Sequence, residues 1–213
     1  MDKKYWNNYY HQHGKDQEIS ICSTFADFCV KQIFPKKSVK IVELGSGNGR
    51  DAIHFAHQKM SVIAIDQSTA AIDIEKKELH HEAGKYLHPK ALDFVREDYS
   101  KYGAIDIFYS RFTIHSITKE EEELLLPNIY QSLKKNGLFC IEVRTIKDPL
   151  YGVGECCGEN TYKTDHKRRF INSKIFLEDV LRVGFELVYF IEKNDLSVYA
   201  DDNPVLMRII LKK

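Results

Sequence analysis

The chain has 213 residues, which is enough for one domain with a sizeable core. Its 31 basic and 31 acidic side chains balance, whereas a general nucleic-acid binder usually carries a basic excess. No apolar run reaches the ~18–20 residues of a membrane-spanning helix, so we expect no membrane segment.

Strands and helices alternate along the chain, without an internal repeat or a linker rich in Pro, Gly or Ser. Such alternation predicts a doubly wound α/β fold, in which helices cover both faces of a mostly parallel sheet. Short apolar runs predict strands at residues 39–44, 61–66, 93–96, 105–110, 138–143, 186–192 and 205–211. Periodicity and capping residues predict helices at residues 21–33, 48–60 and 70–82, from Thr118 to near Gly137, and from Ser173 to Gly184.

Three hydroxyl residues are candidate helix caps. Ser20 precedes the first helix, Thr118 forms a capping-box pattern with Glu121, and Ser173 is placed to cap the last helix. The aromatic run YWNNYY at residues 5–10 precedes these helices. It either packs on the outer layer or forms a lid over a ligand cleft.

The strongest local signal is the glycine-rich run ELGSGNGR at residues 43–50, between a predicted strand and a predicted helix. Glycine permits the tight turn and a close approach of ligand to backbone, and the helix N-terminus offers free N–H groups. A dinucleotide fingerprint would need glycine where Arg50 stands, and the Gly-Lys-Ser/Thr of a P-loop is absent. Glu43 would repel a pyrophosphate but suits an ammonium or a sulfonium group.

Two acidic residues follow at the ends of later strands. Asp66 lies 21 residues after Gly45, a spacing at which an acid binds the two ribose hydroxyls of a nucleotide. Asp98 follows the predicted third strand, where it either accepts a hydrogen bond from an adenine amine or simply caps a loop. The glycine loop together with Asp66 is far more specific than either feature alone.

The segments VELGSGNGRDAIHFA, IAIDQS, VREDYS and IDIFYSRFTIHSI resemble the successive motifs of class I, Rossmann-like S-adenosylmethionine-dependent methyltransferases of the small-molecule type. The resemblance covers residues 39–145 and continues loosely to the C-terminus. It implies seven strands with the last one antiparallel, S-adenosyl-L-methionine as cofactor and S-adenosyl-L-homocysteine as product. It also implies one domain, 1–213, with an N-terminal segment and possible lid at 1–36, a cofactor-binding core at 37–145, an acceptor-site insertion at 146–172, and a helix and β-hairpin at 173–213.

The resemblance also assigns roles to single residues. Glu43 or its neighbours orient the methionine ammonium, Asp66 holds the ribose, and Arg111 lies near the methionine moiety or the acceptor. The implied cofactor-binding residues are Glu43, Gly45, Gly47, Gly49, Asp66, Gln67, Asp98, Tyr99 and Arg111. One departure is that residues 97–104 are too few for a long crossover helix between the third and fourth strands.

Arginines near the predicted strand ends indicate the acceptor. Arg144 ends the fifth strand, and Arg168 and Arg169 lie in the insertion. The length of this insertion predicts that it shapes the acceptor pocket together with the aromatic N-terminus. Their guanidinium groups suit a phosphorylated or carboxylated metabolite or sugar. The alternative is that Arg168 lies on a solvated face and that Arg144 pairs with Glu142 or Asp148.

His115 and His166 are the candidate general bases, since an alcohol or amine acceptor must lose a proton. The alternative for both is a packed histidine. An acceptor that is already an anionic oxygen needs no base, and His115 would then only position it.

We therefore expect an enzyme that methylates a small, anionic acceptor, with O-methylation favoured and no nucleic-acid or membrane partner. The alternatives are an RNA or protein methyltransferase and a non-catalytic module that binds the cofactor. Residues 1–14 lack the apolar core of a signal peptide, and five cysteines without a CxxC pair are typical of reduced thiols, so we expect a cytoplasmic protein without a metal site. The adjacent Cys156 and Cys157 leave a metal or redox role open, and the acceptor, the methylated atom and the oligomeric state are not determined.

Overall fold

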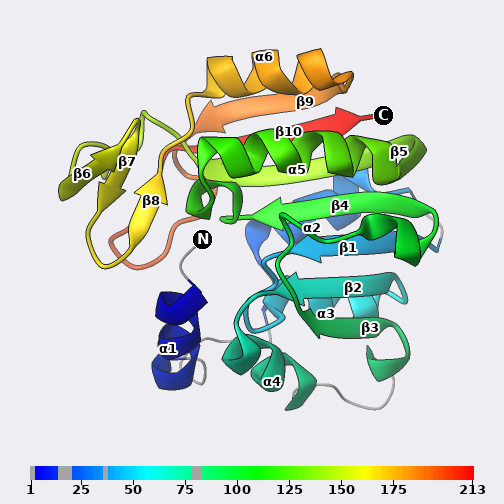
Figure 1. Cartoon of the computed structure of the whole chain (residues 1–213). Helices are drawn as coiled ribbons and strands as arrows, with labels where there is room; N and C mark the ends of the chain where they lie inside the picture. Colours follow the sequence, from blue (N-terminus) through cyan, green and yellow to red (C-terminus); the bar gives the residue numbers. More distant parts are fainter. Residues whose placement is uncertain (1–2, 14–20, 36–37, 78–82) are drawn as a thin grey trace.

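The computed structural model describes residues 3–13, 21–35, 38–77 and 83–213 (Figure 1). Seven strands form one sheet in the order β3-β2-β1-β4-β5-β10-β9. The first five run parallel, and β10 is antiparallel to both β5 and β9. The predicted Rossmann-like fold is thus confirmed. The strands are β1 Lys40–Leu44, β2 Ser61–Asp66, β3 Leu87–Ala91, β4 Ile105–Arg111, β5 Leu133–Arg144, β9 Glu186–Lys193 and β10 Leu206–Lys212.

The third strand was predicted wrongly at residues 93–96. β3 is Leu87–Ala91, an edge strand that contains Pro89 and buries only Leu87. An edge strand tolerates proline and needs no apolar run, so the apolar periodicity misses it. The apolar residues of 93–96, Phe94 and Val95, are buried in the core from a turn.

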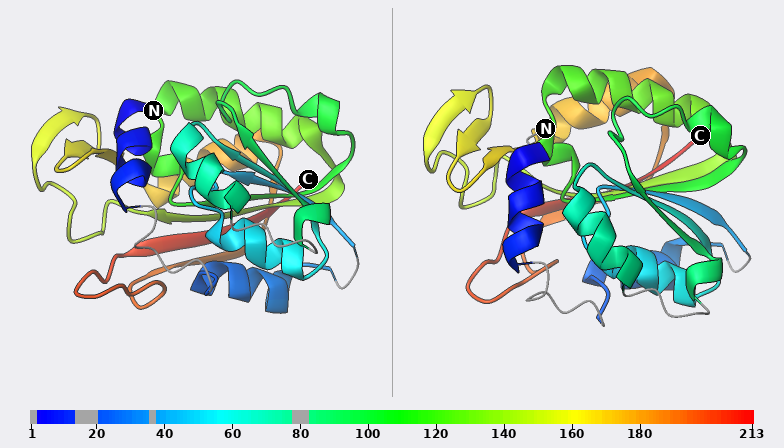
Figure 2. Two further views of the ribbon diagram at one scale, coloured as in Figure 1. Left: turned by 90° about the horizontal axis from the view of Figure 1, so that it is seen from below. Right: turned by 60° about the horizontal axis from the view of Figure 1, so that its bottom comes forward.

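Helices cover both faces of the sheet (Figure 2). One core packs α2, the π-helical turn η1 and α3 against the strands, and the other core packs α5 and α6 against the opposite face. The first helix, α1, has no buried residue and contacts α4 instead. The helical segments are α1 Lys3–His13, α2 Thr24–Phe28, η1 Cys29–Ile33, α3 Arg50–His57, α4 Thr69–Lys77, η2 Ala83–Lys85, η3 Tyr99–Tyr102, η4 Ile114–Ser116, α5 Lys119–Ser132 and α6 Ser173–Val183.

The capping predictions have three outcomes. The Thr118–Glu121 capping box is present at the start of α5. Ser173 is not the cap of α6, because the Asn172 side chain accepts from the backbone N–H groups there while the Ser173 hydroxyl bonds to a glutamate of β9. Ser20 lies outside the described residues.

The segment between β5 and α6 forms a small antiparallel sheet of three strands, β6 Glu155–Gly158, β7 Thr161–Lys163 and β8 Lys167–Arg169. This sheet projects beyond the carboxyl end of β5 and lies beside α1 (Figures 1 and 2). No helix in the described ranges is long and apolar enough to cross a membrane.

Candidate functional site

The glycine loop between β1 and α3 needs its glycines. Gly45, Gly47 and Gly49 have φ angles of 68°, 58° and 86°, in the left-handed region that side chains disfavour. A Cβ at Gly45 would lie 2.6 Å from Thr113 Cγ2. The loop therefore packs tightly against the segment that follows β4 on one side, and its backbone faces a cavity on the other.

This cofactor cavity, of about 230 Å³, lies at the carboxyl ends of β1, β2 and β4. The side chains that line it come from the glycine loop, from these strand ends and from α1. Among the residues predicted from sequence, it brings together Glu43, Gly45, Gly47, Asp66 and Arg111.

Glu43 presents a buried carboxyl group to the cavity. Its Oε2 atom has no hydrogen-bond partner among the described residues, and the side chain is almost fully enclosed. Burial, together with the nearby carboxylates of Asp51 and Glu75, raises the pKa of Glu43 well above its usual value. A cation bound here would supply the missing partner and charge, so the position suits an ammonium group.

Asp66 ends β2 and holds the glycine loop. Its carboxylate accepts hydrogen bonds from the backbone N–H of Gly47 at 3.0 Å and of Ser68 at 2.8 Å. Burial raises the pKa of Asp66 although both bonds oppose the shift. Beside it, the Nε2 atom of Gln67 is buried and has no hydrogen-bond partner in the described part of the chain.

The structure places Asp98 and Tyr99 away from this cavity. Asp98 is exposed and caps η3 by accepting from the backbone and hydroxyl of Ser100, bonds that lower the pKa of its carboxyl group. Tyr99 is buried in the core and donates to the carbonyl oxygen of Phe94 at 2.5 Å. Asp98 is therefore the loop cap that the sequence left as its alternative role.

The acid that follows β3 directly is Asp93. Its carboxylate accepts from the backbone N–H of Val95 at 2.9 Å. The neighbouring N–H of Leu92 donates to the carbonyl oxygen of Asp66, so this segment adjoins the end of β2. The sequence did not predict this position of Asp93, because it placed the third strand over the residue.

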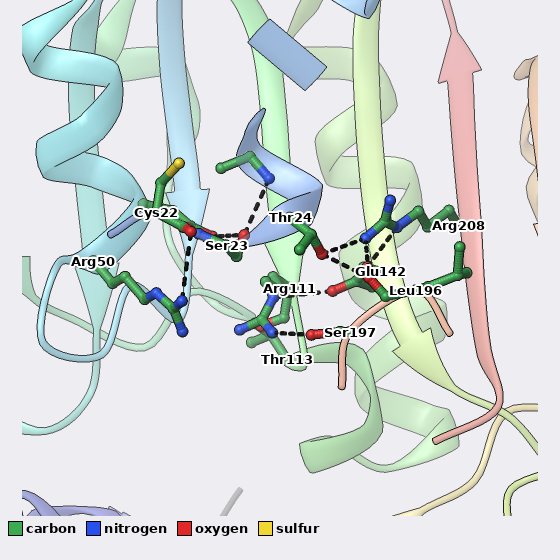
Figure 3. Close-up of polar contacts among 12 residues, drawn as sticks. Cys22, Ser23, Thr24, Arg50, Arg111, Thr113, Glu142, Leu196, Ser197 and Arg208 are labelled. Atoms are coloured by element: carbon green, nitrogen blue, oxygen red, sulfur yellow. Dashed lines mark hydrogen bonds and ion pairs between the residues drawn. The ribbon is translucent and has the colours of Figure 1, made fainter. Parts of the chain in front are cut away.

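Arg111, at the end of β4, is anchored from two sides (Figure 3). Its Nε donates to Glu142 Oε1 at 2.9 Å and its Nη2 donates to Ser197 Oγ at 2.9 Å. Glu142 also accepts from Arg208 Nε at 2.6 Å, so one buried carboxylate joins two guanidinium groups. The Arg111 guanidinium lies 4.2 Å from the ring centre of Phe112, at the wall of the cavity.

A buried network below the glycine loop was not predicted. The Asp51 carboxylate accepts from the Ser23 backbone N–H and hydroxyl, both at 2.7 Å, and from the Tyr109 hydroxyl at 2.8 Å. Arg50 donates to the carbonyl oxygens of Ile21 and Cys22, with the second bond drawn in Figure 3. The start of α2 is thereby tied to the loop. In the sequence, an acid in the first turn of a helix suggests only dipole stabilisation, which hides this role of Asp51.

A second cavity, of about 780 Å³, opens between α1, η4 and the β6–β8 sheet. This second cavity, named the acceptor cavity after the role proposed for it, shares Trp6 and Ser116 with the cofactor cavity, so the two adjoin there. It also contains the predicted residues His115, His166 and Arg169.

Both histidines are buried, and positively charged arginines lie near their rings. Burial and the charge of Arg168 lower the pKa of both rings, that of His115 to well below its usual value. The His115 ring stacks on Phe112 at 5.8 Å, and its Nδ1 has no hydrogen-bond partner in the described ranges. His166 lies with Nε2 3.1 Å from Arg168 Nη2 and Nδ1 2.9 Å from Asp165 Oδ2.

The three predicted acceptor arginines differ in their partners. Arg144 pairs with Asp148 at 3.0 Å and with Asp202, as in the alternative that the sequence left open. Arg169 donates to Glu122 Oε2 at 2.5 Å and to backbone carbonyl oxygens of η4 and the residue after it. Arg168 has a buried Nε without a partner, and no described carboxylate lies within 4.0 Å of it. Burial and the charge of Arg144 lower the pKa of Arg168.

Residues 41–137 match the family model of a methyltransferase domain, and this match covers the glycine loop, Asp66 and the end of β4. Over these residues the chain is similar to methyltransferase domains. No group of three or more His, Cys, Asp or Glu side chains in its described ranges is arranged to hold a metal ion.

The sequence relatives of this chain are distant. It is 28% identical over 113 residues to the carboxy-S-adenosyl-L-methionine synthase of Nautilia profundicola, across 51% of this chain and 46% of that protein. It is 23% identical over 129 residues to an uncharacterized methyltransferase of Oceanobacillus iheyensis, across 59% and 56% of the two chains. The chain thus spans about half the length of these curated relatives.

Solved structures share its fold. The glycopeptide N-methyltransferase MtfA in complex with S-adenosyl-L-homocysteine superimposes with a TM-score of 0.71 at 13% identity, over 94% of this chain and 95% of that one. A TehB-like S-adenosylmethionine-dependent methyltransferase of Corynebacterium glutamicum gives 0.67 at 19% identity, over 97% and 98%. At such low identity the likeness concerns the architecture alone.

Proposed function

We propose that this protein is a class I S-adenosylmethionine-dependent methyltransferase, which transfers the methyl group of S-adenosyl-L-methionine to a small anionic acceptor, with O-methylation favoured. The cofactor supplies an activated methyl carbon, so the protein mainly has to align the acceptor and exclude water. The cofactor cavity fits this role. The buried Oε2 of Glu43 suits the methionine ammonium, and the Asp66 carboxylate at the end of β2 suits the ribose hydroxyls.

The acceptor proposal rests on the missing hydrogen-bond partner of the Arg168 guanidinium group. Its Nε is buried without a hydrogen-bond partner in the described residues, the charge of Arg144 adds positive potential, and no described carboxylate lies within 4.0 Å. A partly buried guanidinium without a carboxylate at ion-pair distance is destabilised, and a ligand can supply that partner. A carboxylate or phosphate on the acceptor would supply both the charge and a hydrogen-bond acceptor.

His115 completes this acceptor site. Its lowered pKa keeps the ring neutral at pH 7, so the unpartnered Nδ1 can accept a hydrogen bond or a proton from a hydroxyl group. An acceptor that attacks through an anionic oxygen needs no such base, and His115 would then act by position. The five free cysteines support a cytoplasmic site of action as part of this proposal.

The test is a methyl-transfer assay with labelled S-adenosyl-L-methionine and a panel of phosphorylated and carboxylated metabolites, each paired with a neutral analogue. We expect transfer to anionic members only. Arg168→Gln should raise the KM for such an acceptor by about 10- to 150-fold, which corresponds to a lost charge-assisted hydrogen bond, and should leave the affinity for S-adenosyl-L-homocysteine unchanged.

The matched control is Lys163→Gln, which removes an exposed charge from β7 in the same small sheet. Equal transfer to neutral analogues, or equal KM values for both variants, would contradict the anion site. Transfer to RNA or protein in place of metabolites would overturn the small-molecule proposal, and no transfer to any acceptor would favour a module that only binds the cofactor.

A further inference from the structure

Helix α1 supplies a cap to another helix. The Oδ1 atom of Asn7 accepts hydrogen bonds from the backbone N–H of Ala70 at 3.1 Å, from Thr69 Oγ1 at 3.1 Å and from Ser68 Oγ at 3.3 Å. Ser68 itself accepts from the N–H of Ala71 at 3.1 Å. The N-terminus of α4 thus has two side-chain caps, of which one comes from 63 residues away in the sequence.

The other side of α1 contacts the acceptor insertion. The Tyr5 hydroxyl donates to Asp165 Oδ2 at 3.0 Å, and the rings of Tyr5 and Trp6 lie 5.1 and 5.0 Å from the ring of His166. Since no residue of α1 is fully buried, these contacts and the Asn7 cap hold the helix in place. Helix α1 therefore bridges α4, on the cofactor side, and the β6–β8 sheet, on the acceptor side (Figure 2).

Between these two attachments, α1 forms part of both cavities. The Tyr10 phenol lies against the glycine loop, where it would clash with a Cβ at Gly47. Burial and the nearby Asp66 raise the pKa of Tyr10, so its hydroxyl stays protonated. Trp6 lines both the cofactor cavity and the acceptor cavity. A displacement of α1 would uncover the first cavity and remove a wall of the second.

We propose that Asn7 is a positioning residue, which docks α1 over the bound cofactor and thereby places Trp6 as the wall between the cofactor and acceptor cavities. This inference rests on the proposed function for the identity of the cofactor. Because α1 covers the cofactor cavity, the cofactor enters and leaves when α1 is undocked. A weaker Asn7 cap should accordingly speed the release of the cofactor and expose Trp6.

The chain contains a single tryptophan, so its fluorescence reports on α1 alone. In wild-type protein, we expect saturating S-adenosyl-L-homocysteine to lower the acrylamide quenching constant of Trp6 at least about 2-fold. Asn7→Ala should remove this protection and raise the dissociation constant of S-adenosyl-L-homocysteine by about 2- to 30-fold, the range for loss of a helix cap. Asn7→Asp should restore both the protection of Trp6 from quenching and the affinity for S-adenosyl-L-homocysteine, since a carboxylate oxygen accepts the same hydrogen bonds and suits a helix N-terminus.

Asn8→Ala is the matched control, because it removes the same amide from an exposed neighbouring position on α1. Equal behaviour of Asn7→Ala and Asn8→Ala would overturn the role of Asn7. If wild-type protein binds S-adenosyl-L-homocysteine calorimetrically but Trp6 quenching does not change, the docking proposal fails while the proposed function stands. If wild-type protein does not bind the ligand at all, the cofactor assignment fails, and this inference fails with it.

Discussion

Glu142 should be among the most sensitive positions of the fold. Its side chain is fully buried between Arg111 and Arg208, with donor–acceptor distances of 2.9 and 2.6 Å. Glu142→Gln removes the shared negative charge and leaves two largely buried guanidinium groups without it. Breaking a buried ion pair in this way costs about 3–5 kcal/mol of unfolding free energy, which for a chain of this size lowers Tm by roughly 6–20 °C.

The assay is calorimetric or urea unfolding of Glu142→Gln beside Glu186→Gln. Glu186 forms an ion pair at 2.6 Å with Lys212 in the same sheet, but its side chain is 67% exposed, so the loss there should not exceed about 1 kcal/mol. Equal destabilisation of the two variants would refute the argument that burial of the ion pair, rather than pairing itself, determines the loss of unfolding free energy. Retention of S-adenosyl-L-homocysteine binding by folded Glu142→Gln would further show that Arg111 keeps its place through Ser197.

Two other predictions concern buried acids. Asp66→Ala should weaken the binding of S-adenosyl-L-homocysteine about 10- to 150-fold, as measured by calorimetry. The control Asp73→Ala, on the exposed face of α4, should leave the affinity unchanged. Unchanged affinity in folded Asp66→Ala would remove Asp66 from the site. Burial raises the pKa of Glu75 to about 8. Between about pH 4.5 and pH 8, the folded protein therefore holds a proton on Glu75 that the unfolded chain has released. The free energy of unfolding should accordingly fall as the pH rises through this range. Glu75→Gln should abolish that contribution, and a pH dependence of Tm identical to that of wild type would contradict it.

The cavity at the carboxyl ends of β1, β2 and β4 was predictable because its sequence signals are local. Apolar runs marked β1 and β2, and the glycines with Asp66 lie within a few residues of those strand ends. The third strand was missed because an edge strand with Pro89 carries no apolar run, and the roles given to Asp98 and Tyr99 depended on that error. The β6–β8 sheet was missed for a similar reason, since its residues are mostly exposed and its strands are three or four residues long.

The ion pairs of the predicted acceptor arginines could not be read in full from the sequence. Besides the near pair of Arg144 with Asp148, two partners lie far away along the chain. Arg144 and Asp202 are 58 residues apart, and Arg169 and Glu122 are 47 residues apart. No periodicity or spacing rule connects such residues. The sequence therefore identified the arginines as a group, and only the folded chain distinguishes Arg168, which has no carboxylate partner among the described residues, from the two that have one.

The two ends of the acceptor insertion are fastened together at its base. Ile146 N–H donates to the Ile171 carbonyl oxygen at 3.0 Å, and Ile171 N–H donates to the Arg144 carbonyl oxygen at 3.1 Å. A change in the length of the chain between these bonds would leave the seven-stranded sheet in register, and each doubling of a flexible loop costs only about 0.6 kcal/mol in closure entropy. Under the proposed function, a graft from 147 to 170 should therefore change the acceptor range while the strands of the seven-stranded sheet keep their register.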